Sequence, residues 1–148
     1  MADRHGPQLA GRFKVEIDGV EVPGWQRVDL PSSHTERGEY REGDDPDWEQ
    51  QLWGQTTFSP LSMVRGVQPG DTQVFDWRET IRMGDVDEGR KTVEVTLMDE
   101  EGEDQIRWKF ENAWITDYDP PTLDAAADGE ILTERIVLDF ESESREEL

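Results

Sequence analysis

Residues 13–22 read FKVEIDGVEV, and apolar side chains occupy every second position in the first half of this segment. A period of two is typical of a β-strand that buries one face and leaves the other in water. Asp18-Gly19 is a strong signal for a two-residue turn, and the alternation resumes after it. The segment therefore predicts an antiparallel hairpin near the start of the folded region.

The same alternation recurs later in the chain and predicts further strands with one buried face. The expected strands cover 56–64, 90–98, 106–110, 112–118 and 131–140, with a bulge or bend between 106–110 and 112–118. The apolar residues expected to form the core of the last part of the sheet are Val93, Val95, Leu97, Ile106, Trp108, Phe110, Ile136, Leu138 and Phe140.

One segment, 72–83, has apolar residues at helical spacing instead. Asp71 or Thr72 is placed to cap its N-terminus, and Gly84 to end it. The chain as a whole is thus predicted to be mainly β. We expect an antiparallel β-barrel or sandwich of six to eight strands with one flanking α-helix.

The length of 148 residues fits a single domain. Residues 1–11 are polar with Gly and Pro and predict a flexible N-terminal arm. The β-domain is expected over 12–141, with a projecting loop at 31–55, and 142–148 is expected to be a loose acidic tail.

The segment 31–55 is polar and long, yet it contains aromatic residues. A loop of this length in a compact domain is usually functional or disordered, and its tryptophans argue against disorder. We expect an extended hairpin that projects and becomes ordered on contact with a neighbouring subunit. Trp is favoured as an interface anchor, and the candidate subunit-interface residues are Tyr40, Arg41, Trp48 and Trp53.

The charge balance is strongly acidic, with 36 Asp and Glu against 15 Lys and Arg and a net charge of −21. Such a surface repels nucleic acid phosphates. Only Lys14, Lys91 and Lys109 are lysines, and the other basic residues are arginines. Excess acid with few lysines is typical of a halophilic protein, in which concentrated salt screens self-repulsion.

Several function classes are excluded or disfavoured. The absence of cysteine excludes disulfides and thiolate chemistry. No apolar run approaches the roughly 20 residues of a membrane span, so no membrane anchoring is expected, and residues 1–10 do not resemble a secretory signal.

The residues of enzyme chemistry are also missing. His5 and His34 are the only histidines, and neither has an identifiable catalytic or metal-binding partner. Neighbouring carboxylates such as Asp44-Asp45 occur by chance in so acidic a chain, and 99–102 is best interpreted as an acidic turn with at most unspecific cation binding. We therefore expect no catalytic, cofactor-binding or metal site, and no enzyme activity.

Seven segments that cover nearly all of 12–141 carry a family resemblance. They are FKVEIDGVEVPGWQRVDL at 13–30, YREG at 40–43, TTFSPLSMVRG at 56–66, VFDWRETI at 74–81, RKTVEVTLMDEEG at 90–102, WKFENAWITDYDPPTL at 108–123 and GEILTERIVLDFE at 129–141. In their order and spacing, these segments resemble the tail-tube proteins of contractile phage tails and related extracellular contractile injection systems. The chain departs from that family in its acidity and in an expanded 44–55.

This resemblance implies a structural subunit of an inner tail tube. Six subunits would form a ring, rings would stack around a lumen, and the partners would be further copies together with sheath, baseplate and cap proteins. The lumen would conduct DNA or protein cargo without sequence recognition. The subunits would assemble in the cytoplasm and leave in an extracellular particle or a virion tail.

Two other functions remain open at this point. One is a secreted ring protein of a type VI-like system. The other is a soluble ligand- or carbohydrate-binding β-sandwich, for which tryptophans at 48 and 53 would supply an exposed aromatic site. A virus and an injection system also share the same kind of tube, so the resemblance does not separate them.

Overall fold

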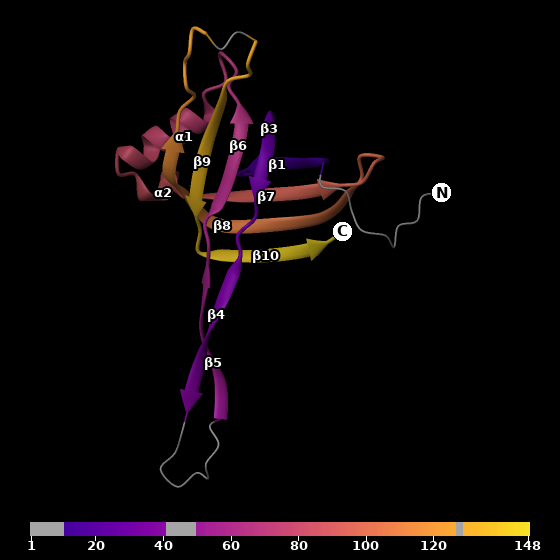
Figure 1. The fold of residues 1–148 in the computed structure, drawn as a ribbon, viewed down its shortest axis with the longest axis vertical. Helices are drawn as coiled ribbons and strands as arrows, with labels where there is room; N and C mark the ends of the chain where they lie inside the picture. The colour runs from indigo at the N-terminus through magenta and orange to yellow at the C-terminus, as the bar shows by residue number, and fades with distance from the viewer. Residues whose placement is uncertain (1–10, 41–49, 127–128) are drawn as a thin grey trace.

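An antiparallel sheet folded back on itself forms the body of the molecule, and a narrow strand pair projects from one end (Figure 1). The computed structural model describes residues 11–40, 50–126 and 129–148. Its elements are β1 (Phe13–Ile17), β2 (Val20–Val22), β3 (Trp25–Asp29), β4 (Ser33–Tyr40), β5 (Gln50–Phe58), β6 (Leu61–Gly66), α1 (Gln73–Arg82), α2 (Val86–Gly89), β7 (Lys91–Met98), β8 (Asp104–Asp119), β9 (Thr133–Asp139) and β10 (Ser142–Glu147).

The body contains eight strands in the order β2-β1-β7-β8-β9-β6-β3, with β10 paired to β8. The long strand β8 belongs to both halves of the sheet: its first half pairs with β7 and β10, and its second half pairs with β9. Asn112 lies between the two halves with φ of 52°, a left-handed conformation that Asn tolerates better than most residues. The predicted bend is therefore present inside one continuous strand.

The predicted fold class is confirmed, with antiparallel strands and a flanking helix. The described residues divide more finely than expected, into ten strands and a second helix of 4 residues. Alternation also places the core correctly at Val15, Val93, Val95, Ile136 and Leu138, all of which are buried.

The first half of β8 differs from the expectation. Phe110 is fully buried, but Ile106 and Trp108 are only partly buried. Figure 1 shows that this half of β8 extends past β6 and β9, so none of the described strands and helices covers it as a second layer. The Arg145 guanidinium lies 5.7 Å from the Trp108 ring centroid and covers part of that ring instead.

Helix α1 packs on the body through Val74 and Trp77, and the Trp77 Nε1 donates a hydrogen bond to the Gly89 carbonyl at 2.7 Å. The predicted cap is only partly present. Thr72 is the N-cap residue, but its hydroxyl donates to the Asp76 carboxylate at 2.9 Å and caps no backbone N–H. An Asp71 carboxylate oxygen instead accepts from the Gln73 N–H at 3.3 Å.

The predicted strand 56–64 is in fact two strands. Pro60, which has no N–H to donate to a sheet, follows Ser59 and separates β5 from β6. As a result, β5 belongs to the projecting pair, whereas β6 lies in the body between β3 and β9.

The prediction of a loose tail at 142–148 is wrong for residues 142–147. They form β10, with Ser142 opposite Glu111 and Glu147 opposite Ile106. Both faces of β10 are largely exposed, so its backbone hydrogen bonds hold it in place and apolar alternation is not required. In the described residues, no helix is long and apolar enough to cross a membrane.

Candidate functional site

The projecting β4–β5 sheet is the most distinctive feature of the described structure. The strands pair antiparallel from Ser33–Phe58 at the base to Tyr40–Gln50 at the far end, with a bulge after Thr35. Figure 1 shows that the pair extends away from the body along the long axis of the molecule. Side chains on both faces of this pair are therefore open to contact with another molecule.

Two glycines let the strands cross closely. A Cβ on Gly38 would lie 3.3 Å from the Leu52 carbonyl oxygen, and one on Gly54 would lie 3.3 Å from both Cβ and O of Glu36. The absence of side chains at these points permits the strong twist that two-stranded ribbons adopt.

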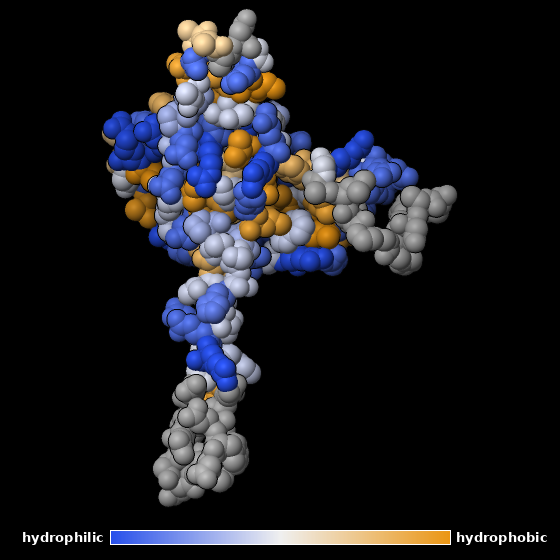
Figure 2. Space-filling model, viewed as in Figure 1, coloured by the Kyte–Doolittle hydropathy of each residue, from blue (hydrophilic) through white to orange (hydrophobic). Residues whose placement is uncertain are grey.

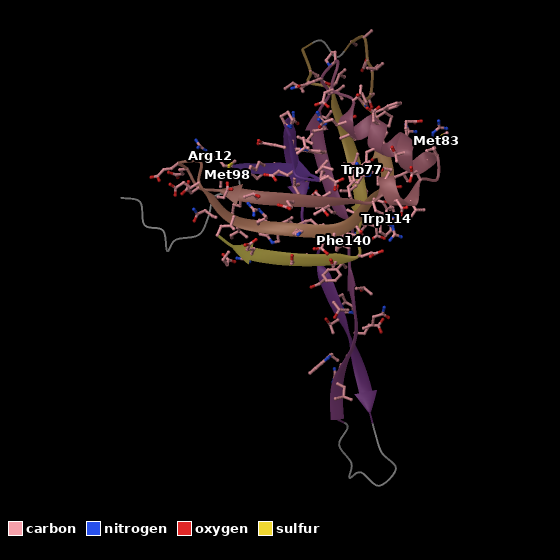
Figure 3. All side chains as sticks on the ribbon, turned by 180° about the vertical axis from the view of Figure 1, so that it is seen from behind. Arg12, Trp77, Met83, Met98, Trp114 and Phe140 are labelled. Atoms are coloured by element: carbon pink, nitrogen blue, oxygen red, sulfur yellow. The ribbon has the colours of Figure 1, made fainter. Side chains whose placement is uncertain are left out.

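An aromatic cluster joins the base of the pair to the core. The Phe58 ring lies 5.7 Å from the Phe140 ring, which in turn lies 5.0 Å from Phe110 in an edge-to-face arrangement. Ser32 and Ser59 close the base with reciprocal bonds of 2.8 Å, one from the Ser32 N–H to the Ser59 hydroxyl and one from the Ser59 N–H to the Ser32 carbonyl. These contacts fix the base of the pair to the body. Figure 3 labels Phe140, which lies in the body where the projecting pair begins.

The four predicted interface residues have different outcomes. Trp53 lies on β5 with 85% of its surface exposed, as an interface anchor in a free subunit should. The Tyr40 backbone pairs with Gln50. Arg41 and Trp48 lie outside the described residues. The structure brings the backbones of Tyr40 and Trp53 into the same sheet, on opposite strands.

β5 carries no charged residue in its nine positions, although a third of the chain is charged. Leu52 is also exposed beside Trp53. Interface cores are depleted in charge relative to other protein surfaces, so this strand has the composition of a surface that becomes covered.

A buried cation lies at the opposite end of β6. Arg65 is 1% exposed, forms ion pairs with Asp71 and Glu134, and places its guanidinium 5.4 Å from the Trp25 ring. Arg65 Nε and Nη1 and Trp25 Nε1 are buried without a hydrogen-bond partner. The cluster ties the loop after β6 to the start of β9.

Tyr118 extends this cluster, because its hydroxyl donates to a Glu134 carboxylate oxygen at 2.6 Å. Burial of the phenol, followed by the bond to Glu134 and the charge of that residue, raises the pKa of Tyr118 to about 12. The Arg78 guanidinium lies 5.1 Å from the same ring. The group is therefore neutral at physiological pH and acts as a hydrogen-bond donor.

Two groups of residues that the sequence analysis considered for chemistry can be placed in the described structure. His34 is exposed on β4 opposite Thr57. Asp99, Glu101 and Glu103 bring carboxylate oxygens within 4.8 Å of one another in the turn between β7 and β8. The Asp99 carboxylate accepts the N–H groups of the other two at 2.9 Å, which is the bonding of an acidic turn.

A folded β-body with a projecting strand pair, of which strand β5 is uncharged, has the architecture of a structural subunit. The model of the family described as T4-like virus tail tube protein gp19 matches residues 9–143. The chain belongs to this family and is a tube subunit. No curated protein matches the sequence at a significant level.

Solved structures of tube proteins have the same fold. A chain of the PVC extracellular contractile injection system, in its sheath–tube complex in the extended state, is 25% identical with a TM-score of 0.84, covering 98% of this chain and 95% of that one. The cap of the anti-feeding prophage tube matches at 23% identity and a TM-score of 0.84, covering 100% and 96%. Hcp1 from Flavobacterium johnsoniae shares the fold at 16% identity and a TM-score of 0.55, covering 90% and 93%.

Proposed function

We propose that six copies of this chain form a ring, and that rings stack into the inner tube of a contractile particle. The observation that carries the proposal is the projecting β4–β5 sheet with its exposed Trp53, in a chain of the tail tube family. A heterologous contact between unlike surfaces repeats indefinitely along an axis, which is the requirement for a tube. Tyr40, Arg41 and Trp48 are proposed to contribute to the same contact.

The tube acts with sheath, baseplate and cap proteins in this proposal. Structures similar to this chain come from a sheath–tube complex, a tube-terminating cap and a baseplate. Such particles are released extracellularly, and the subunits would assemble in the cytoplasm beforehand.

The lumen would conduct DNA or protein without sequence recognition. A net charge of −21 disfavours adhesion of a polyanion to the tube wall, so that DNA would slide without binding. The same acidity, with three lysines, supports a halophilic origin of the protein. Conduction of DNA and conduction of protein are both compatible with the sheet architecture, since neither requires a recognition site.

Electron microscopy of the purified chain tests the proposal. We expect hexameric rings and hollow tubes, and a chain with Trp53→Ala should give rings that stack poorly. Stable monomers at high protein concentration would refute it. Monomers that also bind oligosaccharides in a calorimetric titration would establish the β-sandwich binding module instead.

A further inference from the structure

A second uncharged apolar surface lies at the end of the body opposite β4–β5. Its four exposed side chains are Val67, Leu123, Ile131 and Leu132, with exposed fractions of 37%, 79%, 74% and 40%. We call these four residues the end patch. They belong to the segments that follow β6, follow β8 and precede β9, which meet at the top of Figure 1. Figure 2 shows apolar surface at the same end.

The composition of these segments is as unusual as that of β5. The stretches GVQPG at 66–70, PPTL at 120–123 and ILT at 131–133 contain no charged residue. Copies of a chain with net charge −21 repel one another wherever their acidic surfaces meet. The surfaces on which two copies can approach with least repulsion are therefore strand β5, although its partner β4 carries Glu36, Arg37 and Glu39, and the end patch at the opposite end of the molecule.

The end patch is also held in place. The Val67 N–H donates to the Leu132 carbonyl at 2.9 Å, and Ile131 Cγ2 lies 3.9 Å from the position of a Cβ on Gly66. Beneath it, buried Arg65 connects the loop after β6 to β9 through its ion pairs with Asp71 and Glu134. A preorganised surface loses little conformational entropy on binding.

We propose that the end patch is the receptor for the β4–β5 sheet of a second copy of this chain, with Leu52 and Trp53 packing on Leu123 and Ile131. This inference rests on the proposed ring stacking and assigns the surface that completes it. Since donor and receptor lie at opposite ends of the long axis, each copy uses both at once. The contact is heterologous and continues from ring to ring.

The first experiment compares variants that add two negative charges each at exposed apolar positions. Leu123→Asp with Ile131→Asp places two carboxylates in the receptor. Met83→Asp with Val86→Asp places two at the C-terminal cap of α1 and the start of α2, where the side chains are 77% and 61% exposed. Met83 lies on the flank of the body, away from both ends (Figure 3). We expect single rings from the first variant and normal tubes from the second.

The second experiment detects the contact itself. Because the natural chain has no cysteine, Gln55→Cys with Thr122→Cys introduces one thiol on the donor and one on the receptor, at exposed positions that leave Trp53 and Ile131 in place. A short bismaleimide should link this variant into a ladder of covalent multimers. Gln55→Cys with Met83→Cys is the control and should remain uncrosslinked.

Each outcome decides the inference. Tubes of normal length from Leu123→Asp with Ile131→Asp, or tubes of the cysteine variant that give no ladder, would overturn the end patch and leave ring stacking intact. A natural chain that forms neither rings nor tubes would overturn the proposed function and this inference together. Rings without tubes, combined with a ladder in the cysteine variant, support the assignment.

Discussion

Trp53 and Trp77 have opposite environments within one domain. Trp77 is 3% exposed, packs in the core and donates a hydrogen bond to Gly89, whereas Trp53 is 85% exposed. The same residue type therefore stabilises folding at one position and is available for association at the other.

Alanine at these two positions should separate folding from assembly. Trp77→Ala leaves a cavity and an unpaired Gly89 carbonyl, and we expect it to lower the free energy of unfolding by roughly 3–5 kcal/mol. Trp53→Ala should change it by less than about 0.5 kcal/mol, because little is buried there. Thermal unfolding followed by circular dichroism measures both. A large loss of stability in Trp53→Ala would show that this side chain packs within its own subunit.

Tyr118 predicts an alkaline limit of stability. Its folded-state pKa of about 12 lies above the ordinary value of 10.0, so the unfolded chain loses the proton first. The stability that Tyr118 contributes is therefore complete below about pH 10 and is lost as the pH rises toward about 12.

Urea unfolding between roughly pH 9 and pH 12 tests this prediction, because this interval spans the ordinary and the raised pKa of the phenol. Tyr118→Phe should flatten the decline, and Tyr40→Phe leaves Tyr118 as the only phenol for a tyrosinate absorbance titration. An ordinary pKa in that titration would contradict the assigned environment.

At the scale of elements, the sequence predicts the strands in which apolar residues alternate. It misses β10, a strand that is held mainly by its backbone pairing with β8. In β7 the buried Val93 and Val95 lie two positions apart, so the period of two reveals this strand. Ile136 and Leu138 have the same spacing in β9, although Val137 between them is buried as well. β10, with the sequence SESREE, buries almost nothing and has no pattern to detect. An acidic edge strand of this kind is held by its neighbour, which a local pattern does not encode.

Removal of β10 tests its structural role. A chain that ends at Glu141 exposes the edge of β8 and loses the contact of Arg145 with Trp108. From the usual worth of cross-strand and cation–π pairs, we expect a loss of about 1–3 kcal/mol and a tendency to aggregate. The measurements are chemical unfolding and light scattering.

The control for this truncation matches its change of charge. Residues 142–148 carry three Glu and one Arg, a net charge of −3 + 1 = −2. Glu143→Gln with Glu146→Gln removes the same charge but retains the strand. Equal effects in both variants would assign the change to charge and not to β10.

At the scale of the whole molecule, the sequence identifies one half of the candidate site. Tryptophans in a long polar segment indicate the projecting sheet, and Trp53 is placed there correctly. The end patch escapes detection because Val67 follows β6, whereas Leu123 and Ile131 lie in the connection between β8 and β9, and only the folded sheet brings these two connections together. The available signal in the sequence was the absence of charge in 66–70, 120–123 and 131–133. This signal indicates a common surface only when the fold shows that these stretches are neighbours.

The net charge of −21 predicts a salt-dependent fold. Self-repulsion sums over all pairs of like charges and grows about as the square of the net charge. The ion pairs add only one by one, and in the described residues all but those of Arg65 are at least partly open to solvent. The Debye length falls from about 10 Å at 0.1 M salt to about 3 Å at 1 M, so salt removes more repulsion than attraction.

We therefore expect the melting temperature of the poorly stacking Trp53→Ala variant to rise between 0.1 and 1 M NaCl (about the range over which screening becomes strong). KCl should act equally, since screening depends on ionic strength and not on a cation site. A variant with Glu143→Gln and Glu146→Gln should start at a higher melting temperature in low salt and gain less. If the midpoint is flat or falls with salt, repulsion does not limit this fold, and the halophilic interpretation of the composition fails with it.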